Sequence, residues 1–268
     1  EDGLDVVTTL DLEMQDVADR ALRRQLEAQN ALWGTALVME VATGDLLAMA
    51  NLSRTKSGAY AEVKNHALSS RMEPGSTFKL AALLALVDDA GMSLDETFDT
   101  GNGARVKVGR TTVQDSHGLP PLNLKDAVAH SSNVFFARAV YETYKDDPER
   151  YVDYLRHLHL DRTVGLEEFG AVAPIFPAPG MKIWYPDVSI VNMGYGYAIE
   201  LTPLHTLTLY NAVANDGCMV APRLVREIRR GGEVVERPER RVLVDKICSS
   251  SALRKVRECL EEVGTTGT

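Results

Sequence analysis

The sequence predicts a fold of the α/β class. Two near-continuous apolar segments, residues 35–41 and 46–50, flank the short turn at residues 42–45 and predict a buried β-hairpin. Elsewhere, stretches with apolar residues at helical spacing alternate with other strand-like segments. The 268 residues contain no internal repeat or low-complexity tract. One α/β unit is therefore the simplest organisation.

The N-terminal elements are predicted to be an extended segment, a helix and the hairpin, followed by a loop. Residues 1–10 form the extended segment, and Asp11 is the expected N-cap of a helix whose apolar residues recur as far as Leu26. After the hairpin, residues 51–63 are polar and contain a glycine, which predicts a loop.

A helix is predicted over about residues 76–90, after Pro74-Gly75 and before Gly91. Its segment 80–87 is apolar on every side, which is typical of a helix surrounded by protein. The elements after it are expected in this order: a loop or small hairpin at 97–121, helices at 124–144 (capped by Asn123) and 148–159, irregular chain at 160–200, a helix at 202–215, strand-like segments from 220 with a turn at 231–232, and a last helix from 249–251 to 263.

Composition excludes several classes of protein. Lys and Arg total 29 against 38 Asp and Glu, so the net charge of −9 makes the chain a poor ligand for phosphate backbones and argues against nucleic-acid binding. No apolar run has the length of a membrane span, and no signal sequence opens the chain. Three scattered cysteines do not predict a disulfide framework, and His157 and His159 lack the convergent partners of a metal site.

The pattern Ser-x-x-Lys occurs twice, at Ser53…Lys56 and Ser76…Lys79. Residues three apart share a helix face, so a lysine that is kept neutral can remove the serine proton during attack on a carbonyl. Ser53 is expected in the polar loop, where both groups stay solvated. Ser76 opens the apolar helix, where burial would lower the pKa of Lys79. The alternative is that Ser76 is an ordinary N-cap and Lys79 a solvated first-turn residue.

The longer string Glu73-Pro-Gly-Ser-Thr-Phe-Lys79 resembles the active-site signature of class B penicillin-binding proteins, the monofunctional peptidoglycan transpeptidases. The resemblance covers nearly the whole chain. It implies a penicillin-binding/β-lactamase-like serine transpeptidase fold, with a central antiparallel sheet and an all-α portion. Ser76 would be the nucleophile and Lys79 its base. The other segments that carry the resemblance are residues 8–15, 36–50, 65–68, 194–196, 201–203 and 214–217.

Ser131-Ser132-Asn133, between two predicted helical halves, resembles the second motif of this family, Ser-x-Asn. The family pattern implies that Ser131 relays a proton between Lys79 and the leaving amine. Asn133 would orient the lysine and bind the peptide carbonyl of the substrate. Without the resemblance, a polar helix break or cap is the simpler interpretation.

The third motif of the family, Lys-Thr/Ser-Gly on a strand of the cleft, is not found. Residues 266–268 resemble its end, but Thr265 stands where the lysine belongs and follows a predicted helix directly. We therefore interpret residues 1–268 as a transpeptidase domain without its last strands, possessing no anchor or pedestal domain. The sequence leaves open whether this portion alone is active or inactive.

The resemblance implies peptidoglycan cross-linking by acyl transfer from D-Ala-D-Ala stem peptides, with β-lactams as covalent inhibitors and no cofactor or metal. It also implies cell-wall synthesis or division proteins as partners, in elongation or division, and a location outside the cytoplasmic membrane through an N-terminal anchor absent here. The alternatives are a serine β-lactamase or β-lactam-sensing relative and a non-catalytic cell-wall scaffold module. Two features argue against the lactamase. The chain has Ser131-Ser132-Asn133 in place of Ser-Asp-Asn, and it lacks a Glu-x-x-Leu-Asn loop.

Overall fold

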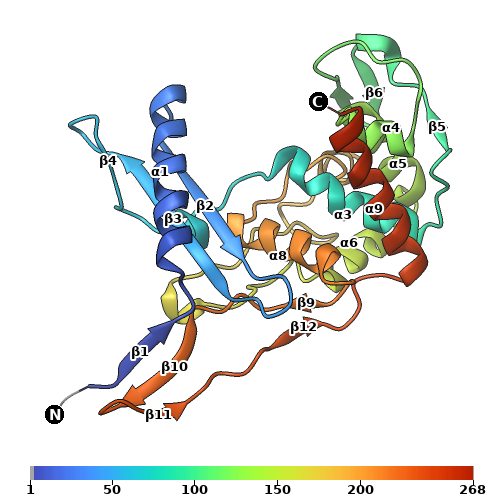
Figure 1. Cartoon of the computed structure of the whole chain (residues 1–268). Coiled ribbons are helices and arrows are strands. Elements are labelled where there is room, and N and C mark those ends of the chain that lie inside the picture. The colour runs from blue at the N-terminus through green and yellow to red at the C-terminus, as the bar shows by residue number, and fades with distance from the viewer. Residues whose placement is uncertain (1–2, 268) are drawn as a thin grey trace. The chain divides into compact units, whose positions relative to one another are not determined.

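The computed structural model describes residues 3–267 and has a mixed α/β fold with antiparallel sheets, as the sequence predicts (Figure 1). The chain divides into two compact units. Unit 1 consists of Glu1–Arg71, Arg162–Ala173 and Thr202–Asp245, and unit 2 of Met72–Asp161, Pro174–Leu201 and Lys246–Thr268. Among the described residues, no helix has both the length and the apolar character that a membrane span requires.

Unit 1 is built around the predicted hairpin. Strands β2 and β3 pair antiparallel, with Ala36 opposite Ala50, and β4 continues the sheet beyond β3. Helix α1 lies along this sheet, where Ala18 packs on Ala48 and Ala50 (Figure 1). The elements of unit 1 are β1 (Asp5–Thr8), α1 (Leu12–Gln29), β2 (Trp33–Met39), β3 (Leu46–Arg54), β4 (Tyr60–Ala61), α2 (His66–Ser69), a 3₁₀ turn (Glu167–Phe169), α8 (Pro203–Ala214), β9 (Met219–Val220), β10 (Val225–Arg230), β11 (Glu233–Glu236) and β12 (Val242–Val244).

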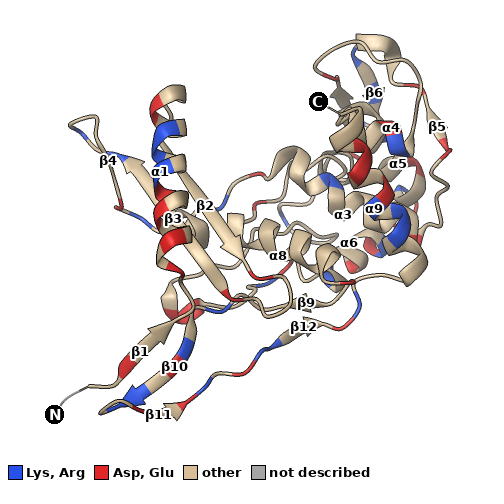
Figure 2. Ribbon diagram, viewed as in Figure 1, with Lys and Arg blue, Asp and Glu red and all other residues tan. Residues whose placement is uncertain are grey.

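Pairing between strands confirms one local prediction for unit 1, the extended segment at its start, and corrects another. The lead-in at residues 5–8 is strand β1, because it pairs antiparallel with β10. The predicted loop at 51–63 begins too early, since β3 runs to Arg54 and β4 pairs with its end. The outward face of α1 carries interleaved acidic and basic residues, which fits its exposure to solvent (Figure 2).

Unit 2 is mainly helical. Its elements are a 3₁₀ turn (Gly75–Phe78), α3 (Lys79–Leu84), a π-helical turn (Ala85–Asp89), β5 (Thr97–Phe98), a 3₁₀ turn (Gly101–Gly103), β6 (Val106–Val108), β7 (Thr111–Val113), β8 (Leu122–Asn123), α4 (Leu124–Ala129), α5 (Asn133–Tyr144), α6 (Pro148–His157), α7 (Ser189–Met193) and α9 (Ser250–Thr265). The small hairpin expected within 97–121 is the β6–β7 pair.

The apolar helix predicted after Pro74-Gly75 lies at the centre of unit 2 (Figure 1). Every residue from Leu80 to Val87 is buried, and α3 contacts both α5 and α9. The helical segment begins with a 3₁₀ turn and ends with a π turn, so Ser76 lies in a tighter turn than the sequence predicts. Because this segment is enclosed by protein, residues at its start are held in fixed positions.

Candidate active site

Ser76 and Lys79 lie one turn apart at the start of this buried segment. The Lys79 Nζ is 3.1 Å from the Ser76 Oγ. Ser76 is exposed, whereas Lys79 is only 5% exposed. Ser76 does not cap the turn, because Pro74 is the residue before the first helical position. The arrangement therefore places an accessible hydroxyl beside an amine withdrawn from water.

Burial changes the protonation of that amine. Desolvation lowers the pKa of Lys79 from 10.5 to about 8, although the negative charge of Asp115 acts in the opposite direction. At pH 7 the neutral fraction of the amine therefore rises from roughly 0.03% to roughly 10%. A lysine that loses its proton this readily can act as a base near neutral pH.

Lys79 also reaches the two other predicted site residues. Its Nζ lies 2.5 Å from the Ser131 carbonyl oxygen, 3.0 Å from the Ser131 Oγ and 2.8 Å from the Asn133 Oδ1. A neutral amine has two N–H donors and one lone pair. The carbonyl of Ser131 and the amide oxygen of Asn133 can only accept, so they take both donors. The lone pair is then left for a hydroxyl proton.

The Ser-Ser-Asn motif forms the break between α4 and α5. Ser131 has a left-handed backbone conformation with φ of 52°. Ser132 is the N-cap of α5, and its Oγ accepts a hydrogen bond from the Phe135 N–H. The break directs the Ser131 hydroxyl and the Asn133 carboxamide toward Lys79. All four predicted site residues are thus brought together within unit 2.

The structure adds residues that the sequence analysis did not select. The buried carboxylate of Asp115 accepts hydrogen bonds from the Ser132 hydroxyl and from the backbone N–H of Asn133. In the sequence, Asp115 is only a carboxylate that follows a short strand. Such carboxylates are too common for this position to identify a functional residue. A cavity of about 230 Å³ opens beside Asn133; its lining residues are Glu73, Asn133, Asn192, Tyr195 and Tyr197.

Gly75 and Gly196 bring two backbone segments into close contact just before Ser76. The Gly75 N–H donates to the Gly196 carbonyl over 2.9 Å. Gly196 has a φ of +91°, and a Cβ there would collide with the Gly75 carbonyl. Glycine is therefore required at position 196 for both conformation and space.

The second Ser-x-x-Lys pair has no comparable arrangement. Ser53 lies in β3 rather than in a loop, and its hydroxyl is hydrogen-bonded to the His66 Nε2 over 2.7 Å. Lys56 is exposed. At the other end of the chain, Thr265 is the last residue of α9 and the described residues after it form no strand. Thr268 lies outside the described residues.

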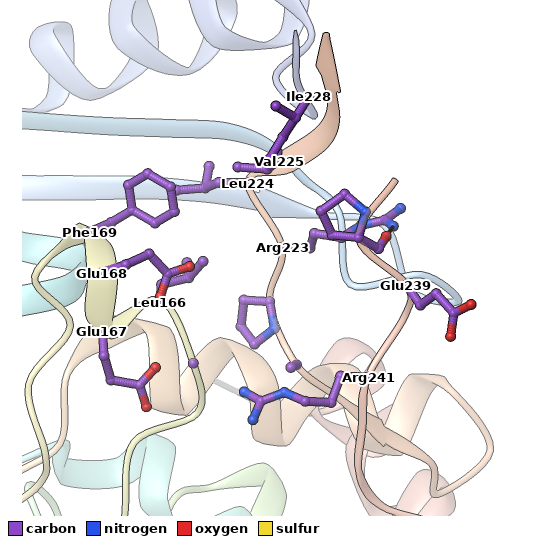
Figure 3. A pocket seen from close by; sticks show the side chains of 14 residues that line it. Leu166, Glu167, Glu168, Phe169, Arg223, Leu224, Val225, Ile228, Glu239 and Arg241 are labelled. Carbon is purple, nitrogen blue, oxygen red and sulfur yellow. Dashed lines mark hydrogen bonds between the residues drawn. The ribbon is translucent and has the colours of Figure 1, made fainter. Parts of the chain in front are cut away.

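Unit 1 contains a larger cavity, of about 550 Å³, between the 167–169 turn and β10 (Figure 3). Apolar side chains such as Phe169 and Leu224 face it together with charged ones. The residues that line it include no serine, cysteine, lysine or histidine, and the Arg223 guanidinium is paired with Asp45 over 2.6 Å. This cavity therefore offers no nucleophile for acyl transfer. Within residues 3–267, no group of three or more His, Cys, Asp or Glu could hold a metal ion.

Comparison with known proteins connects this geometry to a family. The model of the penicillin binding protein transpeptidase domain matches residues 34–268. This chain belongs to that family. The family and fold that the Glu73–Lys79 string indicated are thereby confirmed.

Individual relatives of this transpeptidase domain agree. Penicillin-binding protein PbpB of Mycobacterium tuberculosis is 28% identical over 274 residues, covering 97% of this chain and 38% of the relative. The probable peptidoglycan D,D-transpeptidase PenA of Neisseria gonorrhoeae is 25% identical, covering 82% of this chain and 37% of the relative. The crystal structure of M. tuberculosis penicillin binding protein 3 complexed with ampicillin has a TM-score of 0.83 and 27% identity, covering 97% of this chain and 57% of that one. The chain thus spans less than two fifths of the length of these curated relatives.

Proposed function

We propose that this transpeptidase domain cross-links peptidoglycan by serine acyl transfer, with Ser76 as nucleophile, Lys79 as base, Ser131 as proton relay and Asn133 as the orienting amide. The observation that carries the proposal is the buried Lys79 Nζ, which lies within 3.1 Å of both serine hydroxyls and the amide oxygen. The name of the relative PenA, a probable peptidoglycan D,D-transpeptidase, supports the substrate class.

In the first half-reaction, Ser76 Oγ attacks the carbonyl between the two terminal D-alanines of a donor stem peptide. The hydroxyl proton passes to the lone pair of neutral Lys79 as the Oγ–C bond forms. The C–N bond then breaks, and the departing D-alanine amine takes the proton from Lys79 through the Ser131 hydroxyl. The products are an acyl-enzyme at Ser76 and free D-alanine.

In the second half-reaction, an amine of a neighbouring stem peptide attacks the acyl carbonyl. Its proton returns through Ser131 and Lys79 to the Ser76 oxygen as the ester bond breaks. A new amide then joins the two stems, and the neutral amine is restored. Asn133 holds Lys79 throughout, since its Oδ1 accepts from Nζ while its Nδ2 donates to the Gln114 carbonyl over 3.4 Å.

A β-lactam would enter the same sequence at its first step. Ring opening keeps the leaving nitrogen attached to the acyl group, so the acceptor position stays blocked and the adduct persists. The solved relative complexed with ampicillin supports this part of the proposal. We also propose that the whole protein acts on the outer face of the cytoplasmic membrane, beside other cell-wall synthesis or division proteins.

The experiment is D-alanine release and cross-linking with a synthetic pentapeptide ending in D-Ala-D-Ala and an amine acceptor. It uses a form extended beyond Thr268, with Ser76→Ala as the inactive variant and Ser53→Ala as the matched control. We expect D-alanine release and a cross-linked product with the unchanged protein and with Ser53→Ala, and neither with Ser76→Ala. Product formation by Ser76→Ala would refute the assignment of the nucleophile. A penicillin adduct lost within minutes would instead favour a β-lactamase, and no adduct or product would favour a scaffold.

A further inference from the structure

We propose that Asp115 is a positioning residue for acyl transfer, which holds the Ser131–Asn133 turn against Lys79. The inference rests on the proposed function, because it assigns the turn a catalytic use. Asp115 follows β7, and its side chain is almost fully buried, at 7% exposure. A carboxylate is seldom buried unless it is fully hydrogen-bonded, so its partners indicate why it is there.

All the hydrogen-bond donors that the structure gives the Asp115 carboxylate come from the start of α5. Oδ2 accepts from the Ser132 hydroxyl over 2.8 Å. Oδ1 accepts from the backbone N–H groups of Asn133 and Val134, over 2.5 and 3.1 Å. These two N–H groups belong to the first turn of α5 and have no partner within the helix. A negative charge at this end of a helix is also favoured by the helix dipole.

The turn that Asp115 holds has a conformation that needs support. Ser131 is not glycine, yet its φ is 52°, in the left-handed region that costs a side-chain-bearing residue about 1 kcal/mol or more. This conformation turns both oxygens of Ser131 toward the Lys79 Nζ. Because Asp115 anchors the next two residues by side chain and backbone, it opposes relaxation of the turn. The same loop fixes the Asn133 amide, whose Nδ2 donates to the Gln114 carbonyl.

Asp115 also acts on Lys79 through its charge. The carboxylate raises the pKa of Lys79, against the larger lowering by burial. Removal of the charge therefore has two separable effects. Loss of the anchor lowers the maximal rate of acylation, and loss of the charge moves the titration of Lys79 to lower pH. A residue that only stabilised the fold would not move that titration.

The test is the pH profile of acylation by a fluorescent penicillin, measured on the extended form with Asp115→Asn. Asp99→Asn is the matched control, because the Asp99 carboxylate also accepts from a backbone N–H, that of Gly101, but is exposed and has no bond to the motif. We expect the acylation rate constant on the high-pH plateau to be about 10- to 100-fold lower for Asp115→Asn than for the unchanged protein. The reason is that the substitution leaves a buried hydrogen-bonding group unsatisfied. The midpoint of the pH profile of Asp115→Asn should lie at lower pH than that of the unchanged protein. Asp99→Asn should match the unchanged protein in both plateau and midpoint.

Equal plateaus for Asp115→Asn and Asp99→Asn would overturn the proposal, and so would a lower plateau with an unmoved midpoint. If circular dichroism shows that Asp115→Asn does not fold, Ser132→Ala takes its place. It removes one of the three hydrogen bonds to Asp115, together with the cap bond from the Phe135 N–H, and keeps the charge of Asp115. That variant should lower the plateau without moving the midpoint, and an unchanged plateau would overturn the proposal. If the unchanged protein forms no adduct, it is the proposed function that fails.

Discussion

The lowered pKa of Lys79 predicts a specific dependence of acylation on pH. With a pKa of about 8, the neutral fraction of Lys79 is roughly 1% at pH 6, 10% at pH 7 and 50% at pH 8. If the neutral amine is the base, the second-order rate constant for acylation by penicillin rises about 50-fold between pH 6 and pH 8. Above pH 9 it becomes constant. Stopped-flow measurement with a fluorescent penicillin gives this profile directly.

The alternatives give different profiles. An ordinary lysine with a pKa of 10.5 would make the rate rise about tenfold per pH unit through pH 9 without a plateau. A rate independent of pH between 6 and 9 would mean that Lys79 is not the base. Lys56→Met is the control, since this exposed lysine belongs to the other Ser-x-x-Lys pair and its loss should leave the profile unchanged. Either alternative profile would refute the reasoning.

The same pKa has a consequence for stability. Lys79 has a lower pKa in the folded protein than in the unfolded chain, so the unfolded chain binds more protons between pH 8 and pH 10.5. The contribution of Lys79 to the free energy of unfolding should therefore increase by about 2 kcal/mol as the pH rises from 7.5 to 9.5. Urea unfolding of the unchanged protein and of Lys79→Met, compared at both pH values, isolates this contribution from those of other groups. An equal pH dependence in the two proteins would show that Lys79 is not perturbed.

Three other substitutions test the geometry. Asn133→Ala should lower the acylation rate constant about 10- to 100-fold, because Lys79 loses the amide oxygen 2.8 Å away; an unchanged rate would remove Asn133 from the site. Tyr144→Phe should lower the free energy of unfolding by about 1 kcal/mol with acylation unchanged, since its buried hydroxyl bonds a backbone carbonyl over 2.9 Å; denaturant unfolding that showed no loss would contradict this. Gly196→Ala should abolish acylation by displacing the backbone before Ser76. Gly232 has a similar φ but open space around it, so Gly232→Ala should leave acylation intact. Equal activity of the two variants would contradict the close contact between Gly196 and the Gly75 carbonyl.

The elements that the sequence predicted well are those that depend on local chemistry. Asp11, Asn123 and Ser249 cap helices with side chains that accept from backbone N–H groups three residues on, as their residue types indicate. The hairpin follows from two apolar segments and a short turn. The approach of Ser76 to Lys79 is also local, because residues three apart in a helical turn are neighbours.

The features that the sequence did not predict depend on contacts between distant segments. Residues 5–8 become a strand only through pairing with β10, more than 200 residues later. Ser53 is drawn into β3 by pairing with β4 and is bonded to His66. Asp115 lies 16 residues before Ser131, and only the folded loop brings its carboxylate to the start of α5. No periodicity or spacing in the sequence marks such contacts.

The central claim is that the Ser76 hydroxyl, beside the buried amine of Lys79, is the reacting group. The most direct measurement is tandem mass spectrometry of peptides from the penicillin-treated extended form, which locates the adduct on a single residue. The account predicts one penicilloyl group per chain, on Ser76, and none on Ser76→Ala. An adduct on Ser53 or Ser131, or one that survives in Ser76→Ala, would contradict it.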